Sequence, residues 1–74
     1  MIISKTPVRD FYGKILGYIE IDGTTGIHTI RNFYMKILGR YDPKDNKTRD
    51  FFGRVIGKGD LSGMLINMDQ NGQL

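Results

Sequence analysis

Hydrophobic and polar residues follow a nine-residue pattern that this chain uses three times. The pattern is RDFYGKILG at residues 9–17, RNFYMKILG at 31–39 and RDFFGRVIG at 49–57. The copies begin 22 and then 18 residues apart, so the connecting segments differ in length while the pattern is kept. A motif reused in this way indicates one supersecondary unit that is built three times.

Two secondary structures fit this unit. Apolar residues between Val8 and Ile19 recur three and four positions apart, as on one face of a helix, which makes short helices one interpretation. Gly13 and Gly53 oppose it, because each would lie inside a short helix at a cost of about 1 kcal/mol relative to alanine. In the strand interpretation, residues 10–13 fit a type I turn that ends in a left-handed glycine and a β-bulge.

The segments between the copies support the strand interpretation. Residues 18–30, YIEIDGTTGIHTI, alternate around a glycine-rich turn and form a second kind of hairpin. We therefore predict a mostly β fold, in which an antiparallel meander of three related hairpins forms a small barrel or a sheet. Short helices at each repeat are the alternative. The repeats cover about 6–20, 28–42 and 46–60 of a single domain, 1–74.

The pattern changes after Gly57. Leu61 and Leu65 fall at helical spacing behind Asp60, a residue type that favours the start of a helix. We therefore expect a short C-terminal helix at about 61–68, packed over the sheet.

The expected strands are apolar on both faces. In the first copy, Ile15 and Ile19 would share one face, while Leu16 and Tyr18 would share the other. A half-solvated sheet alternates apolar with polar residues, so the second face needs a cover of its own. Either the strands close into a barrel, or a second copy of the chain covers that face, which we expect. The candidate interface joins this face to the aromatic turn residues: Phe11, Tyr12, Leu16, Phe33, Tyr34, Leu38, Phe51, Phe52 and Ile56.

Glycine ends each copy of the pattern, at Gly17, Gly39 and Gly57. Inside a strand, glycine marks a bulge, a bend or the close approach of another group. We expect steric fit, rather than contact with a ligand, to explain these three positions.

The chain has 74 residues and no cysteine. A chain of this length buries only about 60% of the surface that its unfolded form exposes, so its core is marginal. Disulfides and thiolate metal sites are excluded, and small domains without them often depend on self-association. These points predict a homo-oligomer, with a dimer favoured.

The net charge is +3, from 11 Lys and Arg against eight Asp and Glu. The charges are interspersed, whereas nucleic-acid-binding proteins usually carry a clustered basic patch. The hairpins could still align a basic row beside the aromatic turns, suited to the phosphates and stacked bases of a single strand. Alternatively, each arginine pairs with an acid such as Asp10, Asp50 or Glu20. The candidate nucleic-acid contacts are Arg9, Lys14, Arg31, Lys36, Arg49 and Arg54.

The remaining motifs give no indication of catalysis. The segment 57–63 resembles the glycine fingerprint of a dinucleotide-binding turn, but too few residues follow it for a βαβ unit. His28 is the only histidine, and residues 41–48 lack the pattern of a calcium loop. We expect a non-enzymatic protein with no catalytic residue, no metal site, no cofactor and no small-molecule ligand.

The start of the chain, MIISKTPVRD, lacks the apolar core and cleavage site of a signal peptide, and the apolar runs are short. We therefore expect a cytoplasmic protein without a membrane segment. The leading hypothesis for its function is a small β-repeat interaction module that self-associates. Binding of single-stranded nucleic acid is possible but not favoured.

The unit D-x-x-G-[KR]-[IV]-[LI]-G resembles that of short uncharacterised bacterial proteins with hairpin repeats, over residues 6–60. This resemblance implies hairpin repeats and no particular activity. A fainter similarity, to the YD repeats of large secreted bacterial proteins, involves Tyr41, Asp42, Asp50 and the pair 53–54.

Overall fold

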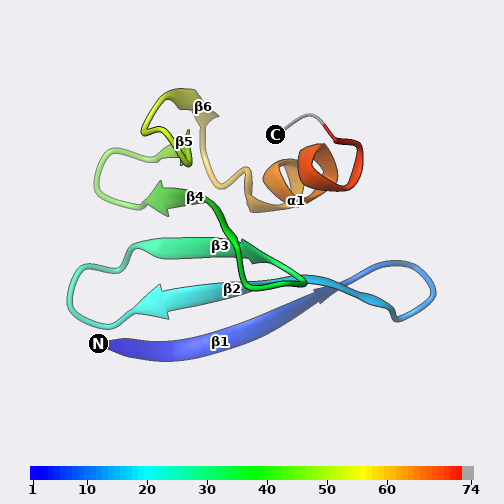
Figure 1. Cartoon of the computed structure of the whole chain (residues 1–74). Helices are drawn as coiled ribbons and strands as arrows, with labels where there is room; N and C mark the ends of the chain where they lie inside the picture. Colours follow the sequence, from blue (N-terminus) through cyan, green and yellow to red (C-terminus); the bar gives the residue numbers. More distant parts are fainter. Residues whose placement is uncertain (73–74) are drawn as a thin grey trace.

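The chain folds into one six-stranded antiparallel sheet and one C-terminal helix (Figure 1). The computed structural model describes residues 1–72. The elements are β1 (Ile2–Arg9), β2 (Ile15–Asp22), β3 (His28–Asn32), β4 (Ile37–Asp42), β5 (Lys47–Asp50), β6 (Val55–Lys58) and α1 (Ser62–Gln70). The strands lie side by side in sequence order, so the sheet is an open meander with β1 and β6 at its edges. The predicted meander with a short C-terminal helix is confirmed.

The three repeats are the hairpins β1–β2, β3–β4 and β5–β6. Because neighbouring strands are antiparallel, the turns 10–14, 32–36 and 50–54 lie at one end of the sheet, here called the turn end. The segments 23–27 and 43–46 connect the hairpins at the opposite end, here called the link end. Figure 1 shows the β1–β2 hairpin reaching out beyond the other two at the turn end.

A β-bulge follows each turn. The pairing register skips Leu16 in the first hairpin, Leu38 in the second and Ile56 in the third. Because a bulge adds one residue to the alternation of faces, Leu16 and the next residue, Gly17, turn to the same face of the sheet. The same holds in the other two hairpins.

Because of the bulges, the second apolar face expected from the sequence does not form as predicted. Leu38 is only 2% exposed and lies in the core with Ile30, while Leu16 and Ile56 pack against that core. These three residues therefore do not form a separate outer interface, and Leu38 is not accessible to a partner chain. The error has a physical cause: strict alternation of side chains along a strand fails where an extra residue is inserted.

Helix α1 lies across the face that carries the bulge residues, and the repeat glycines let it approach closely. It packs against β2, β3 and β4, beside which Figure 1 shows it lying. A side chain added at each glycine would meet one hydrophobic residue in or just before the helix: Ile66 above Gly17, Leu65 above Gly39 and Leu61 above Gly57. Steric fit thus accounts for all three repeat glycines.

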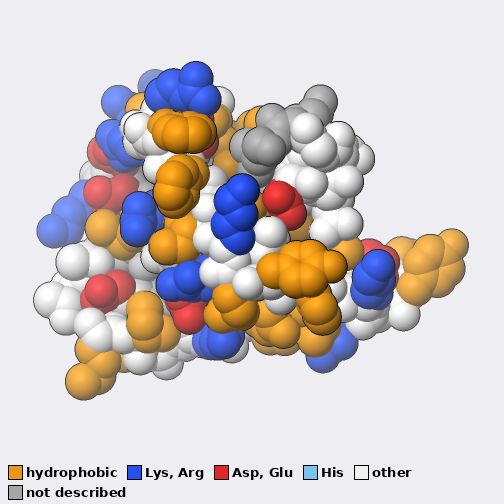
Figure 2. All heavy atoms as spheres, in the orientation of Figure 1, with side chains coloured by type: hydrophobic (Ala, Val, Ile, Leu, Met, Phe, Trp, Pro, Cys, Tyr) orange, Lys and Arg blue, Asp and Glu red, His pale blue; other side chains and the backbone are white. Residues whose placement is uncertain are grey.

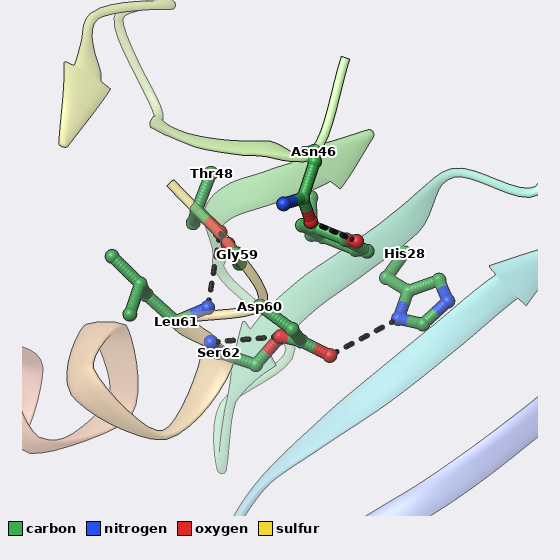
Figure 3. Close-up of polar contacts among 8 residues, drawn as sticks. His28, Asn46, Thr48, Gly59, Asp60, Leu61 and Ser62 are labelled. Carbon is green, nitrogen blue, oxygen red and sulfur yellow. Dashed lines mark hydrogen bonds and ion pairs between the residues drawn. The ribbon is translucent and has the colours of Figure 1, made fainter. Parts of the chain in front are cut away.

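Thr48 connects the start of the helix to the sheet by two hydrogen bonds (Figure 3). Its hydroxyl donates to the carbonyl oxygen of Gly59 at 2.6 Å and accepts from the backbone N–H of Leu61 at 3.0 Å. Thr48 is fully buried, so both hydrogen bonds are shielded from water. Asp60 adds a second attachment, because its carboxylate lies 3.6 Å from Nδ1 of His28 on β3.

Substitution of Gly39 by alanine should destabilise the protein by about 1 to 3 kcal/mol, because it overpacks the core. The new Cβ would lie 2.3 Å from the carbonyl oxygen of Arg49 and 2.8 Å from Cδ1 of Leu65. Urea unfolding midpoints measure the change. The control is Gly63→Ala in α1, where no atom lies within 4 Å of the added Cβ. That change should stabilise the protein by about 1 kcal/mol, and equal effects of the two substitutions would contradict the close approach.

Candidate interaction site at the repeated turns

The three turns share one set of backbone hydrogen bonds. In the first, the N–H of Gly13 donates to the carbonyl oxygen of Asp10 at 3.0 Å, and the N–H of Asp10 donates to that of Lys14 at 2.9 Å. The fourth turn residue is left-handed in every copy, with φ of 83° at Gly13, 70° at Met35 and 84° at Gly53. The predicted turn and bulge are therefore present three times, and Met35 adopts the conformation despite its side chain.

The first residue of each turn also holds the loop with its side chain. Oδ1 of Asp10 accepts hydrogen bonds from the backbone N–H groups of Tyr12, at 2.8 Å, and Lys14, at 2.9 Å. Asn32 and Asp50 make the same two bonds in their turns, each at 2.9 Å. The turn at 10–13 is predicted from the sequence, but the double acceptor is not. The restriction of the position to Asp or Asn was its signal.

Two aromatic rings stand at the tip of each turn. The rings of a pair pack edge to face, with centroids 5.4 to 5.6 Å apart, in Phe11–Tyr12, Phe33–Tyr34 and Phe51–Phe52. All six side chains are exposed. Figure 2 shows hydrophobic side chains projecting at the far right, where Figure 1 places the β1–β2 turn. Turns normally carry polar residues, so these rings form apolar surface that the fold itself does not require.

A groove lies between the second turn and the first hairpin, and another lies between the third turn and the second hairpin. The first groove, of about 220 Å³, is lined by Lys14 and Ile15 of the first hairpin and by Phe33 and Tyr34 of the second. The second, of about 250 Å³, is lined by the equivalent residues one hairpin further along: Lys36, Ile37, Phe51 and Phe52. The turn end therefore contains two grooves lined in part by equivalent residues of adjacent repeats, and Gln70 of α1 also lines the first.

Arginines of the first two repeats donate hydrogen bonds to carbonyl oxygens of their own turns. Nη1 of Arg9 donates to the carbonyl oxygen of Gly13, and Nη1 of Arg31 donates to that of Met35, both at 2.9 Å. Arg31 also pairs across the strands with Glu20, with 2.6 Å between Nε and Oε1. Both guanidinium groups are thus engaged within the fold.

The third repeat pairs one arginine with an acid in the preceding link and the other with an acid in its own turn. Nη2 of Arg49 donates to Oδ2 of Asp45 at 2.7 Å, and this hydrogen bond lowers the pKa of Asp45 and raises the pKa of Arg49. Nε of Arg54 lies 3.0 Å from Oδ2 of Asp50. Three of the predicted arginines, Arg31, Arg49 and Arg54, therefore pair with acids.

The two lysines of the predicted row have a different setting. Lys14 and Lys36 line the two grooves, next to the aromatic pair of the following repeat. Within residues 1–72, neither lysine forms an ion pair. The six predicted nucleic-acid contacts therefore divide into four arginines engaged by the fold and two groove lysines.

His28, the single histidine, contacts other residues of the fold. His28 packs its ring against Tyr41, with centroids 5.2 Å apart, and contacts Asp60 at the start of the helix. Across residues 1–72, no three His, Asp or Glu side chains form a group that could hold a metal ion. In the same part of the chain, no helix is long and apolar enough to cross a membrane. The turn end offers aromatic rings, aliphatic side chains and amines, which suit binding.

Comparison with known proteins adds no assignment. No family model, no curated protein and no solved structure matches the chain. The resemblance to bacterial hairpin-repeat proteins stays a prediction.

Substitution of Met35 by glycine should stabilise the protein by about 1 kcal/mol, because a left-handed backbone strains any residue with a Cβ. Met35 has a φ of 70° and is only partly covered by its neighbours. The matched control, Gly13→Ala, introduces the same strain into the first turn and should lower the urea midpoint. A lower midpoint for Met35→Gly would contradict the strain.

Protonation of Asp50 should make the protein less stable in acid. Burial raises the pKa of its carboxyl, but hydrogen bonds from the backbone N–H and guanidinium of Arg54 and from the N–H of Phe52 outweigh it, so the pKa lies below its usual range. A group with a lowered folded-state pKa stabilises the fold above its unfolded pKa of about 3.9, and this contribution is lost as the pH falls through the lower folded value.

The variant Asp50→Asn tests this pH dependence, because Asn32 shows that an amide oxygen can accept the same two backbone hydrogen bonds. Urea midpoints at about pH 6 and about pH 2 should differ less in the variant than in the wild type. Equal differences in the two proteins would contradict the assignment.

Proposed function

We propose that this protein is a non-enzymatic interaction module that associates with copies of itself through the exposed aromatic rings of its turns. The observation that supports it is the exposure of the second ring in each pair, which is 90% at Tyr12, 84% at Tyr34 and 78% at Phe52. Removing apolar surface from water contributes about 25 cal/mol per Å². Covering these rings therefore contributes favourably to association, against the entropy cost of joining two chains.

The small core gives a reason for association with other copies. Among residues 1–72, the buried hydrophobic residues are Ile30, Leu38, Leu65 and Ile66. A core of this size stabilises a chain only marginally, and small domains without disulfides often gain stability as oligomers. A dimer is the smallest assembly that meets this need.

Light scattering over a concentration series tests the proposal. At about tens of micromolar, where a standard interface holds, the wild type should be a dimer or larger. A triple variant that replaces one exposed ring in each turn should be monomeric and folded, with serine at Tyr12, Tyr34 and Phe52.

The matched control removes three exposed hydrophobic side chains away from the turns, with serine at Ile2, Ile3 and Met64. Its association should equal that of the wild type. A wild type that stays monomeric refutes the proposal. A control variant that dissociates as completely as the turn variant refutes it too.

Binding of single-stranded nucleic acid is a second candidate, and the grooves favour it. Each groove places a lysine beside two aromatic rings, a combination that suits phosphates and stacked bases. Binding to a mixed-sequence oligonucleotide should weaken steeply with salt and fall in the double variant Lys14→Ala/Lys36→Ala. The control variant Lys44→Ala/Lys58→Ala should bind as the wild type does. Absence of binding at low ionic strength removes this candidate.

A further inference from the structure

Each hairpin contributes two different surfaces to the contacts with its neighbours, here called its aromatic half and its aliphatic half. The aromatic half is the ring pair at the tip of a turn, and the aliphatic half is the basic and aliphatic pair that follows a turn. Each groove joins the aliphatic half of one hairpin to the aromatic half of the next. With three hairpins in the chain, the first aromatic half, Phe11–Tyr12, has no hairpin before it, and the last aliphatic half, Arg54–Val55, has none after it. Arg54 lines the second groove within its own turn, so Val55 is the part of this half without a counterpart.

Exposure of the first ring in each pair reflects this difference. Phe33 is 52% exposed and Phe51 is 56% exposed, and each borders a groove shared with the hairpin before it. Phe11 has no hairpin before it and is 97% exposed. The side chain that borders a groove is therefore the less exposed one, with the preceding aliphatic half among the residues that line the groove and Gln70 of α1 also lining the first.

The exposure of the aliphatic halves also depends on a neighbouring hairpin, in this case the hairpin that follows in the sequence. Ile15 and Ile37 are partly buried, and each is followed by another hairpin. Val55 belongs to the last hairpin and is 51% exposed. The two unmatched halves thus lie at opposite edges and are complementary in kind.

The register between hairpins can be continued beyond the edges. A repeat glycine pairs with the first residue of the next turn, as Gly39 pairs with Asp50. The same step beyond β6 places Gly57 opposite Asp10 of a second copy, with β6 and β1 of the two copies adjacent and antiparallel. Helix α1 packs on the central strands β2, β3 and β4, and therefore leaves the unmatched halves at the edges accessible.

We propose that copies of this chain associate head to tail, with the Phe11–Tyr12 turn of one copy docked on Arg54–Val55 of the next. The second copy is the expected occupant because this contact continues the interface that the chain already makes twice between its own hairpins. The inference rests on the proposed self-association and specifies its geometry. Such an interface joins two different surfaces, so a dimer keeps one free half at each end and can add further copies.

Two blocked variants test the geometry. The aromatic variant, Phe11→Ser/Tyr12→Ser, keeps its aliphatic half, and the aliphatic variant, Val55→Lys, keeps its aromatic half. Sedimentation velocity should show that each variant alone loses association, with a dissociation constant at least about tenfold above that of the wild type. An equimolar mixture should form a 1:1 dimer and nothing larger, because only one complementary pair of halves is available.

The outcomes separate this inference from the proposed function. If Val55→Lys alone associates as the wild type does, or if the mixture stays monomeric while the wild type associates, the head-to-tail contact is wrong and self-association stands. If the wild type is monomeric, both are wrong.

A second measurement uses the unmodified chain and does not depend on the folding of a variant. In NMR spectra recorded with rising concentration, the amide signals of residues 10–14 and 54–57 should shift together. Signals from the link segments 23–27 and 43–46 should not shift. Shifts confined to one of the two turn-end segments, or to the link segments, overturn the contact.

Discussion

The extra residue after each turn determines which side chains face the helix, and the rest of the fold depends on this division. Because of it, each hairpin presents a leucine or isoleucine next to a glycine on the same face, as in Leu38 and Gly39. The hydrophobic residue supplies buried surface, and the glycine lets the helix come close enough to cover it. Without the bulge, side chains would alternate regularly, and the hydrophobic residue and the glycine would lie on opposite faces of the sheet. The buried surface and the close approach of the helix would then no longer coincide.

The same turns explain how apolar rings can be held out in water. In each turn, a side-chain oxygen at position 10, 32 or 50 accepts two backbone N–H groups, and in the first two an arginine binds the carbonyl oxygen of the left-handed residue. These bonds fix the backbone of each turn, and the rings at its tip are exposed.

The turns could be predicted from sequence because each depends on local backbone chemistry, as with Asp10 and Gly13. The helix could be predicted because its spacing is local as well. The face of Leu38 could not, since a bulge becomes visible only when the pairing partner of each residue is known. The grooves also lay beyond sequence analysis, because Lys14 and Phe33 come together only through the order of the strands.

The two ends of the sheet differ in how they respond to changes in chain length. The turns have the same length in all three hairpins, while the longer first spacing is accommodated in β2, β3 and the link 23–27. Residues can therefore be added to or removed from the link end without displacing the bulges, the glycines or the rings. Variation in length is thus concentrated at the link end, and an insertion in 43–46 would have to keep the contacts that this link makes, such as the pair of Asp45 with Arg49.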